Sequence, residues 1–351
     1  MKLLRGFATL AVFGLAALSF TACTPAQTTD ASPDRSTDAL VVYSPQGDGP
    51  RGDYIKSHAK AELGLDVTFV SGGGAELTSR LLSEKNNSQA DVVLGFGDAQ
   101  INQIQEAGIL KPYKPEWARL IPNAFTPAGD YTLFSQTPIV ISYNSDVMSA
   151  AEAPKTWEDL AKPEYKNKFS FPGVTGQTGQ AAIAGILWRE ADHASGEVSS
   201  RGWETLKSVL TNAKPAAAGE KFDWKNVASG DVPIVVSWLG GIQTAAADNK
   251  LPMEIVRPKE GTPFVTTAVG LVKGTGKEQA AQRFIDWFGS ADFQAGFVKA
   301  TNNDTPLNTD ALKQLPEAEK ALSTITKQDI DWKVVTKQLS SWLERIQLEI
   351  L

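Results

Sequence analysis

The first part of the chain alternates between short apolar runs and amphipathic stretches. Runs rich in β-branched residues predict buried strands at residues 40–44, 66–70 and 90–94. Apolar positions at helical spacing predict helices at residues 53–63, 75–84 and 99–107. Strands that alternate with helices in this way predict a mainly parallel sheet covered by helices.

A long extended run follows at residues 131–144, after a loop-rich stretch. Pro138 excludes this run from the middle of a helix and interrupts a strand ladder, because proline has no N–H to donate. The run therefore predicts a strand that leaves one sheet and enters another. Downstream, Thr156 with Asp159 three residues later predicts a capped helix start.

The second half repeats the alternation. Strands are predicted at residues 168–172, 232–238, 253–256 and 266–272. Helices are predicted at residues 179–190, 201–210 and 277–288, and most of 311–351 is expected to be helical. The pattern predicts two α/β lobes, with crossings near residues 135–138 and 260–263. The lobe bounds expected are 39–135 with 264–310, and 136–263 with 311–351.

The amino terminus has the pattern of an export signal. Lys2 and Arg5 precede an almost wholly apolar stretch, residues 6–20, which is too short to span a bilayer comfortably. Small residues then precede Cys23, the only cysteine in the chain. This arrangement resembles a bacterial lipobox, in which the cysteine becomes the acylated first residue. The alternatives are an ordinary signal with an incidental cysteine, or an uncleaved anchor.

The signal peptide is thus expected at residues 1–22, and residues 23–38 are expected to form a disordered tether rich in Thr, Ser, Pro and Asp. The protein would face the outside of the cytoplasm on a lipid anchor. A single cysteine also excludes an intramolecular disulfide. The net charge of −6 and the lack of a basic run argue against nucleic-acid binding.

Several segments together resemble a known family. Their order and spacing resemble those of the bacterial extracellular solute-binding proteins of the ferric-iron, thiamine and phosphonate type. The segments are LVVYS, DVTFVSGGGAELTSRLLSEKNNSQADVVLGFGD, TPIVISYNSDV, APKTWEDLAKPEYKNKFSFP and SGDVPIVVS. The resemblance implies a two-lobed, class II periplasmic-binding-protein-like fold with two hinge strands. It also implies a partner ABC permease with its ATPase, to which the protein delivers a small solute. The chain is expected to act as a monomer without a cofactor.

Turns between strands and helices in the first lobe are the candidate ligand contacts there. Backbone N–H groups at helix N-termini are fixed donors that favour anions, and such turns meet at one edge of a parallel sheet. The candidates are Ser44, Gly73, Gly74 and Gly97. The alternative for the glycines is a plain flexible turn. No Gly-Lys-Ser/Thr sequence follows the triple glycine, so this turn is not a Walker loop. The glycines at positions 95 and 97 lack the third glycine of a dinucleotide-binding motif, so that motif is excluded as well.

The second lobe and the hinge supply further candidates. They are Thr137, Thr175, Gln177, Thr178, Ser237, Trp238 and Leu239. Thr178 offers a hydroxyl, and its alternative role is to cap the following helix. Trp238 offers an aromatic wall or a cation–π surface, and its alternative role is core packing.

The ligand class follows from a departure from the ferric-iron pattern. Members that bind Fe(III) directly place adjacent tyrosines at the segment that corresponds to 237–239, whereas no tyrosine follows Tyr165 in this chain. His58 and His193 lie in predicted helices and form no ligand pair, so no metal site is expected. An organic anion such as a phosphonate, phosphate ester or carboxylate, or an iron complex, fits better; direct ferric-iron binding stays an alternative.

Other functional classes have less support in the sequence than transport. Serine catalysis needs a nearby histidine, and no Gly-x-Ser-x-Gly motif occurs. Accidental pairs among the forty acidic residues leave paired-carboxylate hydrolysis open. A sensor or adhesin that uses the same fold also remains open. The expectation is a binding protein and not an enzyme.

Overall fold

The computed structural model describes residues 39–121, 129–174, 176–214, 222–302 and 304–351. These belong to one compact unit, Asp38–Leu351. The expected signal peptide, the Cys23 acylation site and the tether lie outside the described residues and stay predictions. No helix in the described ranges combines the length and the apolar character needed to cross a membrane.

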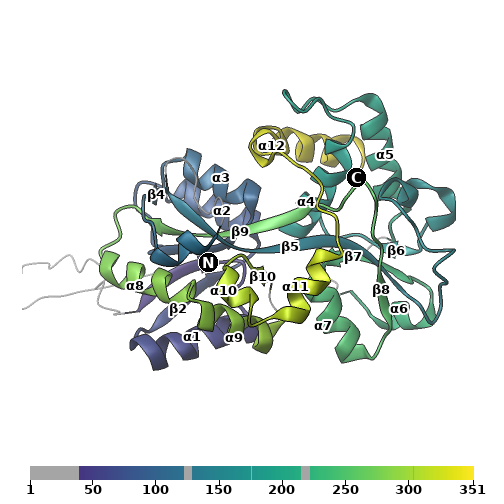
Figure 1. Ribbon diagram of the computed structural model, residues 1–351. Coiled ribbons are helices and arrows are strands. Elements are labelled where there is room, and N and C mark those ends of the chain that lie inside the picture. Colours follow the sequence, from purple (N-terminus) through teal and green to yellow (C-terminus); the bar gives the residue numbers. More distant parts are fainter. Residues whose placement is uncertain (1–38, 122–128, 175, 215–221, 303) are drawn as a thin grey trace, which may run out of the picture. The chain divides into compact units, whose positions relative to one another are not determined.

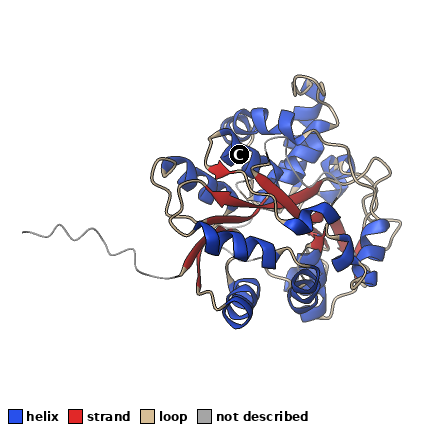
Figure 2. Cartoon of the chain, turned by 60° about the vertical axis from the view of Figure 1, so that its left-hand side comes forward, coloured by secondary structure: helices blue, strands red, loops and turns tan. Residues whose placement is uncertain are grey.

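Strands and helices alternate along the described chain, and helices lie on both sides of the strands (Figure 2). The strands are β1 (Leu40–Ser44), β2 (Val67–Ser71), β3 (Val92–Phe96), β4 (Leu110–Lys111), β5 (Tyr131–Asn144), β6 (Phe169–Ser170), β7 (Ile234–Trp238), β8 (Met253–Ile255), β9 (Phe264–Val272) and β10 (Thr305–Pro306). The helices are α1 (Gly49–His58), α2 (Gly74–Ser83), α3 (Asp98–Glu106), α4 (Gln177–Trp188), α5 (Ser200–Asn212), α6 (Lys225–Ser229), α7 (Leu239–Asn249), α8 (Glu278–Phe288), α9 (Ala291–Thr301), α10 (Thr309–Leu312), α11 (Pro316–Ser323) and α12 (Trp332–Glu349).

The strands form two groups, and the long strand β5 pairs with strands of both. In the first group β1 pairs in parallel with β2 and β3, and β3 pairs with β9. In the second group β6 pairs in parallel with β7, and β7 and β8 pair with β5. We call the elements around the first group the first lobe and those around the second group the second lobe. Figure 1 shows β5 and β9 running side by side between them.

The strand β5 changes partner in its middle. Tyr131–Pro138 pairs with β9, whereas Ile139–Tyr143 pairs with β7. The change falls at Pro138, which has no N–H to give to a ladder. The prediction of a strand that leaves one sheet and enters another is therefore confirmed, as is the two-lobed fold.

The prediction of mainly parallel sheets is wrong in part. Among the described strands, three pairings are parallel and six are antiparallel. Each antiparallel pairing involves β5 or β9, the two strands that run between the lobes. Local alternation of strand and helix predicts the parallel units β1–β3 and β6–β7, but it carries no information about the direction of a strand that crosses between lobes.

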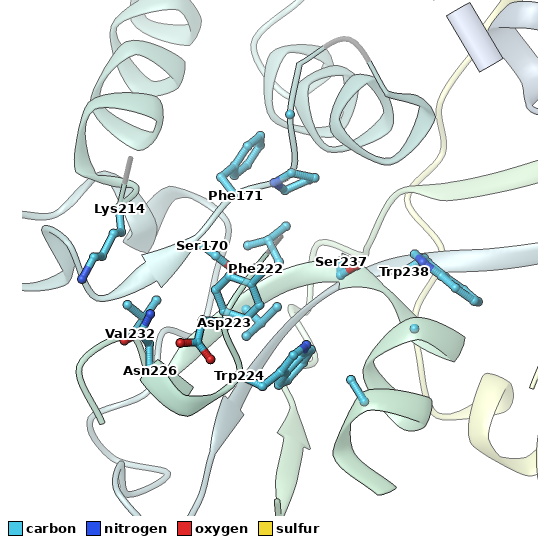
Figure 3. Close-up of a pocket in the computed structure, with 16 residues that line it drawn as sticks. Ser170, Phe171, Lys214, Phe222, Asp223, Trp224, Asn226, Val232, Ser237 and Trp238 are labelled. Atoms are coloured by element: carbon cyan, nitrogen blue, oxygen red, sulfur yellow. The ribbon is translucent and has the colours of Figure 1, made fainter. Parts of the chain in front are cut away.

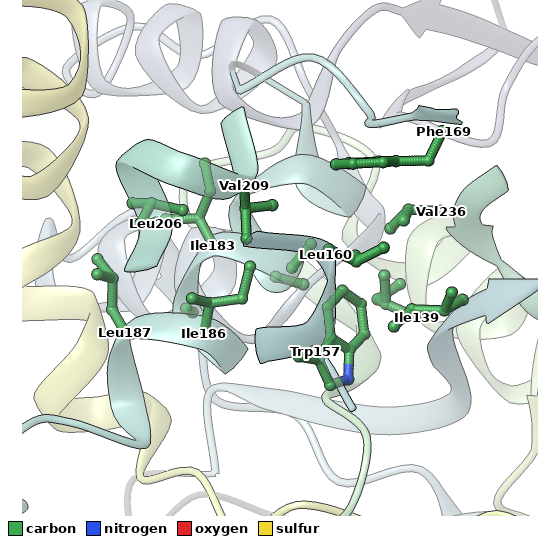
Figure 4. Close-up of a cluster of buried hydrophobic side chains, with 14 of the residues drawn as sticks. Ile139, Trp157, Leu160, Phe169, Ile183, Ile186, Leu187, Leu206, Val209 and Val236 are labelled. Carbon is green, nitrogen blue, oxygen red and sulfur yellow. The ribbon is translucent and has the colours of Figure 1, made fainter. Parts of the chain in front are cut away.

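Each lobe has its own buried core. In the second lobe Trp157, Phe169 and Leu206 are fully buried in one cluster, drawn in Figure 4. In the first lobe Phe134, Phe284 and Phe288 are buried in a separate cluster that includes Val269 and Leu271 of β9. Full burial of one such side chain contributes about 1.5–3 kcal/mol. These cores fix the strands, and with them the turns at the strand ends.

The helix expected after Thr156 is only a short 3-10 turn, Glu158–Ala161. Its predicted capping is present in full: the Asp159 N–H donates to Thr156 Oγ1 at 3.1 Å, and the Thr156 N–H donates to Asp159 Oδ2 at 3.0 Å. Pro163 starts a new turn directly afterwards, so the helix cannot continue.

Candidate ligand site

A pocket of about 220 Å³ lies where strand ends and helix starts of both lobes meet. Six of the predicted residues line it: Gly73, Gly74, Thr137, Gln177, Thr178 and Trp238. Its other lining residues are Pro45, Gln46, Arg51, Gly72, Ile139, Gly176, Val265, Thr267 and Asp304. Segments far apart in the sequence thus meet in one cavity, as a binding site between lobes requires.

Two helices begin at this pocket. Gly73 is the N-cap of α2 and Gly176 is the N-cap of α4, and neither helix has a side-chain cap. The first-turn N–H groups of a helix have no acceptor within the helix, so both helices offer donors and the positive end of a dipole. Thr178 lies inside α4 and is not its N-cap, which removes the alternative explanation for this residue.

Gln177 joins α4 to the first lobe. Its Oε1 accepts a hydrogen bond of 2.6 Å from the Gly97 N–H. A Cβ at Gly74 would lie 2.6 Å from Cγ of Gln177, so only glycine at position 74 lets this side chain pass. A second pair, Gln100 Nε2 to Gln180 Oε1 at 2.5 Å, links the same two helices, α3 and α4.

The pocket contains one cation and one carboxylate among its lining residues, Arg51 and Asp304. The Arg51 guanidinium carbon lies 5.4 Å from the centre of the Trp238 ring, in cation–π geometry. Asp304 is only 7% exposed. Its burial raises the pKa of its carboxyl to about 6, and the charge of Arg51 and a hydrogen bond from Thr137 limit the rise.

Trp238 separates this pocket from a larger cavity of about 510 Å³ in the second lobe. Its ring lies against the backbone of Gly240 and Gly241, where a Cβ would come within 2.4 and 2.7 Å of ring atoms. Figure 3 shows Ser237 and Trp238 at one side of the larger cavity and Lys214 at the other. Ser237 lines this cavity and not the smaller pocket.

The remaining predicted residues lie elsewhere. Ser44 is fully buried, and its Oγ accepts a hydrogen bond from the Gln46 N–H at 3.0 Å. Leu239 is buried in the core beneath α7. The Gly97 N–H is bonded to Gln177, and Thr175 lies outside the described residues. Ligand contact by these residues stays a prediction.

A buried carboxyl also lies where α3 meets the crossing strand β9. Asp98, the first residue of α3, accepts a hydrogen bond of 2.6 Å from the Thr266 N–H. Burial raises the pKa of Asp98 to about 7, although this bond and the charge of Lys327 lower it. Ionisation of this buried carboxyl near neutral pH therefore destabilises the folded state relative to the unfolded state.

Among the described residues, no group of three or more His, Cys, Asp and Glu side chains is placed to hold a metal ion. His58 stacks on Tyr54 at 3.8 Å between ring centres, and His193 stacks on Trp188 at 4.5 Å. Both histidines thus pack on aromatic rings away from the pocket.

Arg51 and Asp304 were not predicted as site residues. Arg51 follows Pro50 and precedes Gly52, a combination that is typical of a loop, yet α1 begins at Gly49. Asp304 precedes a strand of only two residues, β10. Other lining residues did have a signal in the sequence, because they lie in turns that contain predicted residues: Pro45 and Gln46 follow Ser44, Gly72 precedes Gly73, and Gly176 precedes Gln177.

Comparisons with known proteins agree with this geometry. A family model described as bacterial extracellular solute-binding protein matches residues 87–332. A probable ABC transporter periplasmic-binding protein of Sinorhizobium fredii is 37% identical over all of this chain and 93% of its own length. A Salmonella typhimurium periplasmic protein, provisionally named as binding 2-aminoethylphosphonate, is 25% identical over 98% of each chain.

Among solved structures, a ferric binding protein from Campylobacter jejuni has a similar fold. The TM-score is 0.73 at 19% identity, over 89% of this chain and 99% of that protein. At this identity the likeness concerns the fold, and it supports the two-lobed arrangement with crossing strands.

Proposed function

We propose that this chain, which belongs to the family of bacterial extracellular solute-binding proteins, captures a small organic anion in the pocket between α2 and α4. Binding a solute for an ABC importer is the role of the family and of this chain. The specific solute and its contacts are our inference.

The observation that carries the anion assignment is the meeting of two uncapped helix N-termini with Arg51 in one pocket. Each N-terminus carries about half a positive charge and several free N–H donors. A phosphonate, phosphate ester or carboxylate would accept from these donors, with Thr178 and Thr137 as further hydroxyl partners. The Salmonella relative named for 2-aminoethylphosphonate makes phosphonates the first class to test.

An iron cargo is the second candidate, because a structural relative is a ferric binding protein. Fe(III) bound directly needs several anionic oxygen ligands. Among the described residues that line the pocket, Asp304 is the only one with a carboxylate, and none is a tyrosine. Iron in a chelate with an organic acid would instead meet the pocket as an anion.

We further infer that ligand binding closes the two lobes. The change of partner of β5 after Pro138 supports lobes of 39–135 with 264–310, and of 136–263 with 311–351. The Gln177–Gly97 hydrogen bond is a contact of the closed state that opening would break.

The remaining parts of the proposal concern the setting. The chain acts as a monomer, binds its solute without catalysis, and is held to the membrane by acylated Cys23 after removal of residues 1–22. The apolar stretch before Cys23 and the binding-protein relatives support this. The solute then passes to a permease and its ATPase.

Mass spectrometry of small molecules released from the denatured, purified protein tests the proposal. Isothermal titration with 2-aminoethylphosphonate, ethylphosphonate, inorganic phosphate, citrate, Fe(III) and Fe(III)–citrate would follow. We expect a phosphorus-containing or carboxylate anion to bind in the micromolar range or tighter. Tight binding of uncomplexed Fe(III), with no binding of the organic anions, would contradict the proposal.

A further inference from the structure

We propose that the solute also carries a positively charged amino group, and that Asp304 receives this group. The inference rests on the proposed function, since it adds a cationic end to the anion expected in the same pocket. Asp304 would then decide which organic anions the protein accepts.

The position of Asp304 is unusual for a carboxylate in an anion site. It lines the pocket at which α2 and α4 begin, and the first-turn N–H groups of these helices have no side-chain cap. Its hydrogen-bond donors are neutral: Gln46 Nε2 at 3.4 Å and the side chain of Thr137. A buried carboxylate that faces an incoming anion repels it, so a simple anion would bind with a penalty.

A second acceptor lies beside the carboxylate. Gln46 is 4% exposed, and its Oε1 is buried with no hydrogen-bond partner among the described residues. An unpaired buried acceptor is costly, and native structures rarely keep one without a function. An ammonium group has three N–H donors, and it could satisfy both Asp304 and Gln46.

An aromatic face holds the cation of the anion-binding side. Trp238 lines the same pocket and already holds the Arg51 guanidinium over its ring at 5.4 Å. Aromatic faces attract cations and not anions. The pocket thus has an anion-binding side, made by helix N-termini together with Arg51, and a cation-binding side, made by Asp304 and Gln46. A zwitterionic solute, with an acidic group and an amino group on a short chain, matches both.

Asp304 could instead serve only as the counter-charge of Arg51, which lowers its pKa through space. The two roles give opposite results on substitution. If Asp304 only balances Arg51, Asp304→Asn frees the arginine charge and strengthens the binding of every anion alike. If Asp304 receives an amino group, the same change weakens only ligands that carry one.

The test compares two ligands that differ in the amino group alone. O-phosphoethanolamine and ethyl phosphate are titrated calorimetrically into the wild-type protein, Asp304→Asn and the surface control Asp310→Asn at pH 7.5. We expect the wild type and the control to prefer O-phosphoethanolamine at least about tenfold, as a hydrogen bond to a charged group allows. In Asp304→Asn that preference should disappear through loss of O-phosphoethanolamine affinity, while ethyl phosphate binds as before or more tightly.

Each other outcome overturns the inference. Equal affinity of the wild type for both ligands removes the amino-group site but leaves the proposed anion site intact. An equal change for both ligands in Asp304→Asn makes the carboxylate a counter-charge of Arg51. Failure of the wild type to bind either ligand rejects both the inference and the proposed function in this ligand class. Thermal melting without ligand verifies that each variant is folded.

Discussion

Gln177 and Gly97 are hydrogen-bonded across the two lobes, with the Gly97 N–H 2.6 Å from Gln177 Oε1. The side chain reaches this position because Gly74, beside its Cγ, has no Cβ. One glutamine of the second lobe thus lies between the N-termini of α2 and α3 of the first. The glycines at positions 74 and 97 permit this contact between lobes, in addition to any contact with a ligand.

Gly74→Ala should weaken ligand binding without unfolding the protein. The new Cβ would lie 2.6 Å from Cγ of Gln177, so this side chain must move and its hydrogen bond to Gly97 is lost. One such bond contributes about 0.5–1.5 kcal/mol, which corresponds to roughly a threefold to tenfold loss of affinity. Calorimetry measures the loss. The matched control is Gly276→Ala, at an exposed site with open space around it. Equal ligand affinities of the two variants would show that closure of the lobes does not need the Gln177 contact.

Arg51→Gln should weaken anion binding and reduce its salt dependence. The substitution removes the one cationic side chain among the described residues that line the pocket. A hydrogen bond to a charged group is worth about 1.5–3 kcal/mol, so a loss of roughly tenfold to a hundredfold is expected. Titrations at low and high ionic strength measure both effects. The control Arg201→Gln, at a side chain that is 79% exposed, should change neither the affinity nor its salt dependence. If Arg51→Gln leaves the affinity unchanged, the anion does not bind beside Arg51.

Thr178→Ala should lower affinity by about threefold to tenfold, because it removes a hydroxyl donor at the pocket while leaving α4 uncapped as before. The protein should fold normally, since Gly176 and not Thr178 is the N-cap. Thr211→Ala on the exposed face of α5 is the control. Wild-type affinity of the Thr178 variant would remove this residue from the site.

Trp238→Ala should join the small pocket to the larger cavity and weaken binding at least about tenfold, because Trp238 lines both. Trp238→Phe keeps an aromatic ring against Gly240 and should retain most of the affinity. Melting temperature and calorimetry on both variants separate lost packing from lost binding. If the alanine variant is stable and binds normally, the wall between the cavities has no role in recognition.

Asp98→Asn should stabilise the protein more at pH 8 than at pH 5. The folded-state pKa of Asp98 is raised from 3.8 to about 7 by burial, so the folded state binds the proton more tightly than the unfolded state. Wild-type stability therefore falls as pH rises from about 4 through about 7. The asparagine variant lacks this loss, and its advantage should grow by roughly 1–3 kcal/mol between the two pH values. A pH-independent difference in melting temperature would contradict the burial argument.

The alternation of apolar runs and helical spacing predicts the strands and helices around both cores, and the proline in the run 131–144 predicts the crossing between lobes. Those signals are local and repeated over several turns or strand residues. The direction of β9 was not predictable, because it depends on pairing with strands more than a hundred residues away. The helices α7 and α9 were missed, since glycines in their first turns or interiors weaken the helical pattern.

The candidate site was predictable where it is made by turns between strands and helices. Gly73, Gly74, Gln177 and Thr178 meet because those turns lie at the carboxyl ends of strands, which the alternation already placed. Asp304 was not predictable. It reaches the pocket through a two-residue strand that pairs with β5, and neither its neighbours nor its spacing distinguishes it from a surface loop residue.

A crystal structure of the protein with bound ligand tests the central claim most directly. The account predicts that the acidic group of the ligand lies in the 220 Å³ pocket, within hydrogen-bonding distance of first-turn N–H groups of α2 and α4. Ligand density confined to the 510 Å³ cavity beside Lys214 and Trp224, with the smaller pocket occupied by water alone, would contradict it.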